Sequence, residues 1–189
     1  MANFEVFKPI LDKIENGYLS AAMAAKIKDS GGETYRGISR NNNPTSEIWT
    51  IIDAYKRVHG IPKWKSIIPD ARLNKLVDDL TKIKYWDALK LDTIKNQSVA
   101  NYMMDFGFNS GTGTVANIVQ RLVKVNVDGK VGALTVNQIN KSDQKKFFDA
   151  LVAARVAFLE KSPKINPDLK DELIERAQSF FFRVESELV

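Results

Sequence analysis

The chain has 189 residues, of which 44% are hydrophobic and 27% are charged, and its formal net charge is +5. This composition is that of a globular protein long enough to bury a core, so it excludes disordered and fibrous classes. The chain contains no cysteine and a single histidine, His59. These counts exclude disulfide scaffolds and thiol nucleophiles, and they argue against a histidine-based metal site or a Ser-His-Asp triad. We therefore expect carboxylates to carry any chemistry.

The positive charge is concentrated in the first half of the chain, where residues 1–90 contain 15 Lys/Arg and 11 Asp/Glu. This bias favours a polyanionic partner, such as nucleic acid, anionic lipid or a cell-wall polymer, without choosing among them. No apolar run reaches 18 residues, so no membrane insertion is expected. The first five residues lack the charged and apolar regions of a secretory signal, so we expect synthesis in the cytoplasm and export by another route.

The spacing of apolar residues predicts a mainly helical chain. The first helix is expected over residues 7–14, where these residues follow i, i+3, i+4, i+7 spacing, and Asn16-Gly17 ends it. Turn-forming residues at 29–34 and a short ribbon at 35–39 predict a small β-hairpin near residues 29–39. The fold class is therefore α+β and predominantly helical. Further helices are expected at 47–58, 70–82, 94–106, 115–122, 135–140, 144–160 and 168–188.

Glu15 is the first candidate for acid chemistry. It lies one position after Ile14 and four after Leu11, on the border of the buried stripe and at the C-terminal end of the first helix. Partial burial and the helix dipole both favour the protonated carboxyl and raise its pKa. A carboxyl that stays protonated near neutral pH is what a general acid for glycosidic cleavage requires. On spacing alone, an exposed glutamate at a helix end is the simpler interpretation.

The loop at 29–34 contains a second carboxylate, Asp29, and a hydroxyl, Thr34. A pair of carboxylates can divide acid and base roles, and a threonine can hold an attacking water. The simpler interpretation is that Gly31-Gly32 form a tight turn that Asp29 caps.

Two other patterns are weaker. Residues 111–116 (GTGTVA) match a dinucleotide fingerprint, but that motif needs a preceding strand, and residues 99–106 have a helical pattern. We therefore reject nucleotide binding. The chain's three tryptophans could stack on sugar rings, although most aromatic residues at helical spacing belong to a core.

The order of the motifs resembles the N-terminal signature of glycoside hydrolase family 108. The segments that carry the resemblance are 15–18 (ENGY) and 29–39 (DSGGETYRGIS). The family pattern is Glu-Gly-Gly-Tyr followed by Asp-x-Gly-Gly-x-Thr-x-x-Gly-Ile, and Asn16 is the one internal departure in the first motif. Members are phage endolysins and bacterial N-acetylmuramidases, some described as secretion-activating proteins.

The second half is similar to the peptidoglycan-binding region that follows in that family, so the resemblance spans residues 7–183. The family usually has Gly-Trp before the final arginine, where this chain has Phe182. The motifs that match in order are Tyr85-Trp86, Asp105, Asn109-Ser110-Gly111, Gln120–Leu122, Asp128–Thr135, Arg155 and Phe181–Arg183.

The resemblance implies a lysozyme-like fold with the catalytic glutamate at a helix end beside a small hairpin. It implies a lysozyme-like catalytic region over residues 1–92 and a helical peptidoglycan-binding region over 93–189, packed as one compact body. It also implies hydrolysis of the β-1,4 link between N-acetylmuramic acid and N-acetylglucosamine, with no metal and no cofactor. Action would take place at the periplasm or cell wall after holin-type or other export.

Site residues also follow from the resemblance. Glu15 would be the general acid, and Thr34 and Asp29 would position or activate water. The substrate-binding residues would be Tyr18, Trp86, Asp105 and Asn109. The stereochemical outcome and the oligomeric state stay open.

Two other classes of function predict different behaviour. A non-catalytic peptidoglycan-binding or secretion-associated protein would bind sacculi without releasing reducing ends. A nucleic-acid binder would show strongly salt-dependent affinity. The chain has no recognised DNA-binding motif and its cations are dispersed, so we expect no nucleic-acid partner.

Overall fold

The computed structural model describes residues 1–14, 17–163 and 167–184, and these residues divide into two units. The sheet unit is Lys8–Ile83, and the helical unit combines Met1–Phe7 with Lys84–Val189. The division falls after Ile83, nine residues before the predicted boundary at 92. The packing of the two regions as one compact body stays a prediction.

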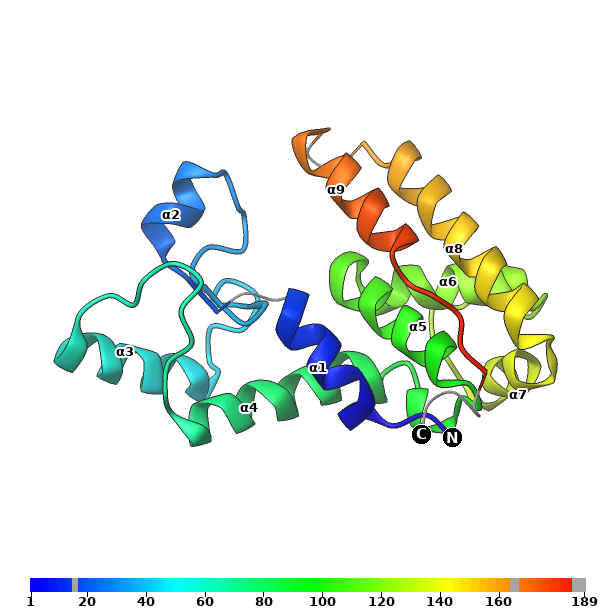
Figure 1. The fold of residues 1–189 in the computed structure, drawn as a ribbon, viewed down its shortest axis with the longest axis horizontal. Coiled ribbons are helices and arrows are strands. Elements are labelled where there is room, and N and C mark those ends of the chain that lie inside the picture. The colour runs from blue at the N-terminus through cyan, green and yellow to red at the C-terminus, as the bar shows by residue number, and fades with distance from the viewer. Residues whose placement is uncertain (15–16, 164–166, 185–189) are drawn as a thin grey trace. The chain divides into compact units, whose positions relative to one another are not determined.

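The sheet unit consists of short elements, several with clear sequence signals for their ends. Ser20 accepts a hydrogen bond from Met23 N and begins a short helix, and Ser46 and Asp70 cap two longer ones in the same way. Helix α1 begins in the helical unit and ends in the sheet unit. The elements are α1 (Phe4–Ile14), β1 (Tyr18–Leu19), α2 (Ala21–Lys26), β2 (Thr34–Tyr35), β3 (Ile38–Ser39), α3 (Glu47–His59) and α4 (Ala71–Thr81) (Figure 1).

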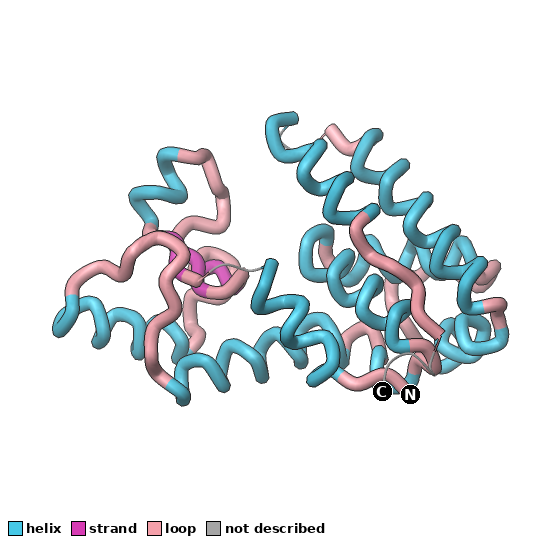
Figure 2. Tube along the Cα trace, viewed as in Figure 1, coloured by secondary structure: helices cyan, strands magenta, loops and turns pink. Residues whose placement is uncertain are grey.

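The three strands form a small antiparallel sheet in the order β1-β2-β3, shown in magenta in Figure 2. Tyr35 pairs with Ile38, so only Arg36 and Gly37 connect β2 and β3. Both have positive φ, 45° and 76°, which is the backbone of a type I′ hairpin turn. The predicted hairpin near residues 29–39 is therefore confirmed, and β1 adds a strand that the sequence pattern did not indicate.

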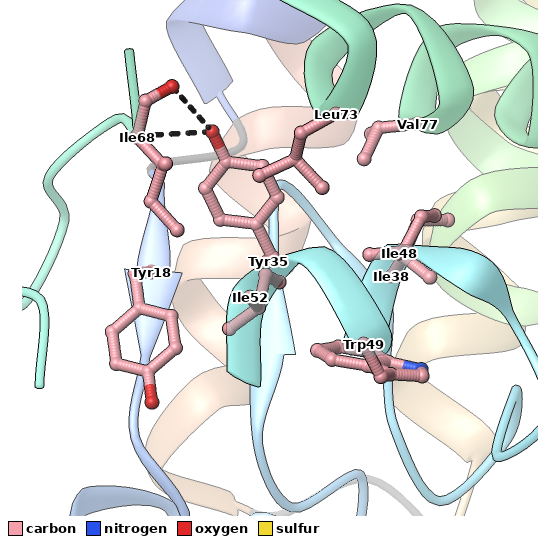
Figure 3. Close-up of a cluster of buried hydrophobic side chains, with 9 residues drawn as sticks. All are labelled: Tyr18, Tyr35, Ile38, Ile48, Trp49, Ile52, Ile68, Leu73 and Val77. Carbon is pink, nitrogen blue, oxygen red and sulfur yellow. Dashed lines mark hydrogen bonds between the residues drawn. The ribbon is translucent and has the colours of Figure 1, made fainter. Parts of the chain in front are cut away.

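Aromatic and branched side chains from the sheet, α3 and α4 form the core of the sheet unit (Figure 3). The Tyr35 hydroxyl lies within hydrogen-bond distance of both the backbone N–H and the carbonyl of Ile68, so the loop before α4 is fixed to the sheet. The fully or almost fully buried members are Tyr18, Tyr35, Ile38, Ile48, Trp49, Ile52, Ile68, Leu73 and Val77.

The helical unit is built around α5, whose residues 97–107 are all buried. Helix α5 packs against α6 and α8, and α8 packs against α9 (Figure 1). The first residues of the chain join this unit because Ala2 N donates to Ile94 O at 2.8 Å. The elements are η1 (Lys82–Asp87, a π-helix), η2 (Leu91–Thr93, a 3₁₀ helix), α5 (Gln97–Ser110), α6 (Thr112–Leu122), α7 (Ala133–Lys141), α8 (Gln144–Lys161) and α9 (Pro167–Gln178).

The structure confirms a predominantly helical α+β, lysozyme-like fold and corrects one helix. The last helix was predicted to run from 168 to 188, but α9 ends at Gln178. Phe180 and Phe182 follow in extended chain, and their rings pack on Tyr102 and Phe148 at centroid distances of 5.4 and 5.7 Å. These ring contacts hold Phe180 and Phe182 outside a helix, so α9 does not continue to residue 188. Among the helices of the described chain, none is long and apolar enough to cross a membrane.

Candidate active site

The end of α1 lies beside the β2–β3 hairpin, and Arg36 joins them. This buried arginine, in the hairpin turn, donates from Nη2 to Asp12 in α1, and the same atom lies 3.0 Å from Asp78 Oδ1 in α4. Burial opposes the charge of Arg36, but its hydrogen bond to Asp12 and the charge of Asp78 outweigh burial and raise its pKa. Three elements are therefore held at one point by a single side chain.

A cavity of about 380 Å³ opens beside this arginine within the sheet unit. Both cations at the cavity are matched by carboxylates, since Lys8 Nζ lies 2.5 Å from Asp78 Oδ2. The lining residues are Lys8, Asp12, Arg36, Ile67, Asn74 and Asp78.

Glu15 and Asn16, the two residues that follow α1 directly, lie outside the described residues. The next residue, Gly17, has φ of +53°, and its carbonyl accepts a hydrogen bond from Arg36 N at 2.8 Å. A Cβ at Gly17 would lie 2.5 Å from backbone atoms of Lys65 and Ser66. Both the positive φ and the close backbone approach require glycine, which explains this position of the Glu-x-Gly-Tyr motif.

Asp29 and Thr34 stand on opposite sides of the Gly31-Gly32 turn. Asp29 is exposed, and its Oδ1 accepts a hydrogen bond from Gly31 N at 2.8 Å. Thr34 is half-buried at the start of β2 and donates from Oγ1 to Gly32 O at 3.0 Å. The turn-capping interpretation of Asp29 is therefore confirmed, while the roles of both residues toward water stay predictions.

Between these two residues, Glu33 forms the centre of an ionic network that the sequence analysis missed. Its carboxylate is buried and accepts hydrogen bonds from Tyr18 Oη at 2.5 Å and Lys56 Nζ at 2.8 Å, and Arg40 Nε lies 2.7 Å from its second oxygen. Both cations also contact Asp53, Arg40 at 2.6 Å and Lys56 at 2.8 Å. The network ties β1, β2 and α3 together beside Thr34. Glu33 lies inside the DSGGETYRGIS motif, but its neighbours come from residues up to 23 positions away.

The network shifts the pKa values of Asp53 and Tyr18 in opposite directions. Hydrogen bonding to Arg40, aided by Lys56 and opposed by partial burial, lowers the pKa of Asp53 to about 2. Burial and the hydrogen bond to Glu33 raise the pKa of Tyr18 above its usual range. Asp53 therefore stays ionised and Tyr18 stays neutral at neutral pH.

The structure corrects three of the expected substrate-binding residues. Tyr18 is 2% exposed, its ring lies in the core (Figure 3), and its hydroxyl is used by Glu33. Trp86 is fully buried against the rings of Phe4 and Phe7, and its Nε1 donates to Asp92 at 2.5 Å. Full burial leaves neither ring a face for a sugar.

Asp105, the third, is fully buried in the helical unit and faces two arginines. Its Oδ2 lies 2.7 Å from Arg155 Nη1, and its Oδ1 accepts hydrogen bonds from Arg176 Nε and Nη2 at 3.0 and 2.7 Å. Arg155 is also fully buried, and its guanidinium lies over the rings of Tyr102 and Phe106. Asp105 is therefore part of an ion-pair network in the core of the helical unit.

Asn109, the fourth, is exposed and lines a cavity of about 760 Å³ in the helical unit. The cavity lies among α5, α6, α8 and α9, with apolar walls that include Ile118 and Phe158 and with Arg121 and Lys161 among its lining residues. Its size suits a small ligand or part of a polymer. The structure places Asn109 in the helical unit and Thr34 and Asp29 in the sheet unit.

Within residues 1–14, 17–163 and 167–184, no group of three or more His, Asp or Glu side chains is placed to hold a metal ion.

Comparisons with known proteins identify the family of the chain and a solved structure with a similar fold. The sequence model of the family described as glycosyl hydrolase 108 matches residues 13–111, which include the end of α1, the sheet and the Glu33 network. No curated protein matches the chain. Among solved structures, the "Structure of Brucella abortus SagA" is similar, with a TM-score of 0.66 and 22% identity over 97% of this chain and 99% of that chain. This likeness shows a shared fold over nearly the whole of both chains.

Proposed function

Because the chain belongs to glycosyl hydrolase family 108, whose model matches more than half of it, we propose that it is an N-acetylmuramidase. Membership in this family supports glycosidase activity and a peptidoglycan hydrolase-like function. The proposal adds the bond, the β-1,4 link from N-acetylmuramic acid to N-acetylglucosamine, and the general acid, Glu15.

One observation carries the proposal: Arg36 holds the last turn of α1 against the hairpin that contains Thr34. Asp12, which Arg36 binds, precedes Glu15 by three positions in the sequence. A general acid needs fixed geometry relative to its substrate, and rigid elements on both sides supply it.

In the proposed reaction, Glu15 donates its proton to the glycosidic oxygen as positive charge develops on the muramyl ring. A water then attacks the anomeric carbon, and the departing sugar carries away the proton that Glu15 gave. Thr34 Oγ1 donates to Gly32 O, so its lone pairs are available to accept from that water. Asp29, exposed on the same loop, is the proposed base, and no cofactor is required.

We further propose that residues 93–189 bind the glycan wall, with the cavity beside Asn109 as the contact region. This cavity combines apolar walls with a few polar groups, as sugar and peptide ligands require. Action at the periplasm or wall, after synthesis in the cytoplasm and a holin-type or other export step, belongs to the same proposal.

The test is reducing-end release from purified peptidoglycan, with mass spectrometry of the products. Wild type should release fragments that end in reducing N-acetylmuramic acid, and Glu15→Gln should release at least about 100-fold less, because the amide cannot donate the proton. Glu47→Gln is the matched control: Glu47 is an exposed carboxylate of α3 that pairs with Arg72, so its loss should leave the rate unchanged.

A second outcome would establish the non-catalytic alternative. If wild type sediments with sacculi but releases no reducing ends, the chain is a peptidoglycan-binding or secretion-associated protein. Equal rates for wild type and Glu15→Gln would remove Glu15 from the mechanism while leaving the glycosidase assignment intact.

A further inference from the structure

The stretch from Arg57 to Ile67, which we call the basic loop, combines cationic and apolar side chains. It contains Arg57, Lys63, Lys65 and the chain's one histidine, and no Asp or Glu occurs between Asp53 and Asp70. The loop thus contains three of the cations that make the first half of the chain basic. It includes the end of α3 and most of the loop that leads to α4 (Figure 2).

The apolar side chains of the basic loop are exposed. Val58 is 76% exposed, Ile61 72% and Trp64 59%. Exposed large apolar residues are ordinary when they are scattered, but three within seven positions of one segment form a local concentration that calls for a partner.

The cations of the basic loop are available to a partner. Among the residues that the structure describes, neither Arg57 nor Lys63 has a carboxylate partner, whereas Lys56 just before them is paired with Glu33 and Asp53. Lys65 Nζ lies over the Trp64 ring, 4.8 Å from its centroid. An anionic surface would therefore meet unpaired positive charge beside exposed apolar groups.

The loop backbone is fixed at its centre. Lys65 N donates to Tyr18 O at 2.8 Å, and Tyr18 N donates to Ser66 O at 3.0 Å, so the loop pairs with β1. Ser66 N and Oγ both donate to Lys63 O, at 3.0 and 2.7 Å. Trp64, held between these bonds, is presented to solvent with little backbone entropy left to lose on binding.

We propose that the basic loop binds the surface of an anionic lipid bilayer. Arg57, Lys63 and Lys65 attract the phosphate headgroups, while Val58, Ile61 and Trp64 enter the interfacial region. The aliphatic side chains decide between possible polyanions, because a glycan or nucleic-acid backbone offers valine and isoleucine no apolar environment. This is binding at a surface, distinct from the membrane insertion that the sequence argues against, and it is independent of the proposed hydrolase activity.

The chain has a built-in reporter for this test. Trp49 and Trp86 are 2% and 0% exposed, so Trp64 is the one tryptophan in contact with solvent. Full-length protein is mixed with vesicles of phosphatidylglycerol and phosphatidylcholine, or with phosphatidylcholine alone, and emission and co-sedimentation are measured. We expect a shift of emission to shorter wavelength and roughly 100-fold tighter binding to the anionic vesicles, since each of three cations contributes about fivefold.

Variants separate the two contributions. Arg57→Gln/Lys63→Gln should lower binding about 30-fold through lost charge, and Ile61→Ser should lower it about tenfold through lost apolar contact. Phe181→Ala is the matched control, because Phe181 is 77% exposed but lies in the helical unit, and its loss should change nothing. Hydrolysis of sacculi should stay at the wild-type rate in all three variants.

Two results would overturn the proposal. One is equal or absent binding to both kinds of vesicle with no change in Trp64 emission. The other is an emission shift with isolated sacculi or DNA but not with anionic vesicles, which would assign the basic loop to a glycan or nucleic-acid partner.

Discussion

The two units each bury a carboxylate among cations, and they do so in different ways. In the sheet unit, Glu33 contacts Arg40 and Lys56, which are partly exposed and share a second, exposed acid, Asp53. In the helical unit, Asp105 and Arg155 are both fully buried, and Arg176, the second arginine at Asp105, is 18% exposed. The Glu33 network is open, because both of its cations reach solvent, whereas the Asp105 network is closed at its centre, because neither Asp105 nor Arg155 does.

This difference decides what each network contributes. When a member of an open network is lost, water and the remaining acid can replace part of its interactions, as for ion pairs at a surface. When a member of a closed network is lost, an unpaired charge stays buried and its desolvation is not compensated. We therefore expect the closed network to govern the stability of the helical unit and the open one to position the hairpin beside the proposed site.

The largest effect is expected for Asp105→Ala. Removal of this acid leaves Arg155 fully buried without its counter-ion and should lower the free energy of unfolding by about 3–5 kcal/mol, measured by urea denaturation. The matched control is the double change Asp105→Leu/Arg155→Met, which removes both fully buried charges while the partly exposed Arg176 keeps access to water, and it should cost less than the single change. If the double change costs as much or more, packing rather than charge determines the effect.

Glu33→Ala should have a smaller effect. It removes the acceptor of Tyr18, Arg40 and Lys56, but both cations keep Asp53, so we expect a loss of about 2 kcal/mol. Glu33→Gln keeps the size and one acceptor oxygen and should lose about half as much. A loss above that of Asp105→Ala in the same denaturation assay would contradict the distinction between open and closed networks.

The sequence predicted most of the fold because its signals were local. Asp70 and Ser46 act as N-caps near the ends predicted for their helices, and periodic apolar residues marked each long helix. The π-helix Lys82–Asp87 and the true end of α9 at Gln178 were missed. The end of α9 depends on tertiary contacts, because the rings of Phe180 and Phe182 pack on residues elsewhere in the chain.

The sequence predicted the candidate site less completely. The sequence motifs identified Gly17 and the turn that Asp29 caps, because backbone geometry restricts the residue type at these positions. Trp86 and Asp105 were assigned to a sugar-binding surface because aromatic and acidic residues suit that role. The spacing of residues in the sequence does not show which side chains are buried. The two arginines that pair with Asp105 lie 50 and 71 positions away from it in the sequence.

The ionic network around Glu33 is a feature of the site that the sequence did not indicate. Glu33 is one letter in a matching motif, and nothing in its local spacing indicates that Arg40, Lys56 and Tyr18 converge on it. The position of Tyr18 follows from the register of β1 on β2, which pairs Tyr18 with Tyr35 and is a property of the folded sheet. Charge networks of this kind require coordinates.

The smallest effect concerns the open edge of that network and is a dependence on pH. The folded-state pKa of Asp53, about 2, lies below the ordinary value of 3.8, so the unfolded chain binds more protons between these values. Its stabilisation is fully present above about pH 5 and is lost as the pH falls through the folded pKa. Because the side chain is 39% exposed, solvent screening reduces the contribution to about 1 kcal/mol.

Asp53→Asn tests this directly in urea titrations across pH. The variant should be about 1 kcal/mol less stable than wild type near pH 6, the difference should close as the pH approaches 2, and about 0.5 M salt should reduce it. Asp149→Asn is the matched control, since Asp149 forms an exposed pair with Lys145 on α8 and should show a smaller difference. A difference for Asp53→Asn that does not change with pH or salt would mean that packing, and not charge, sets the contribution of Asp53. The Glu33 network would then not be open to solvent at Asp53, and its contrast with the pair at Asp105 would fail.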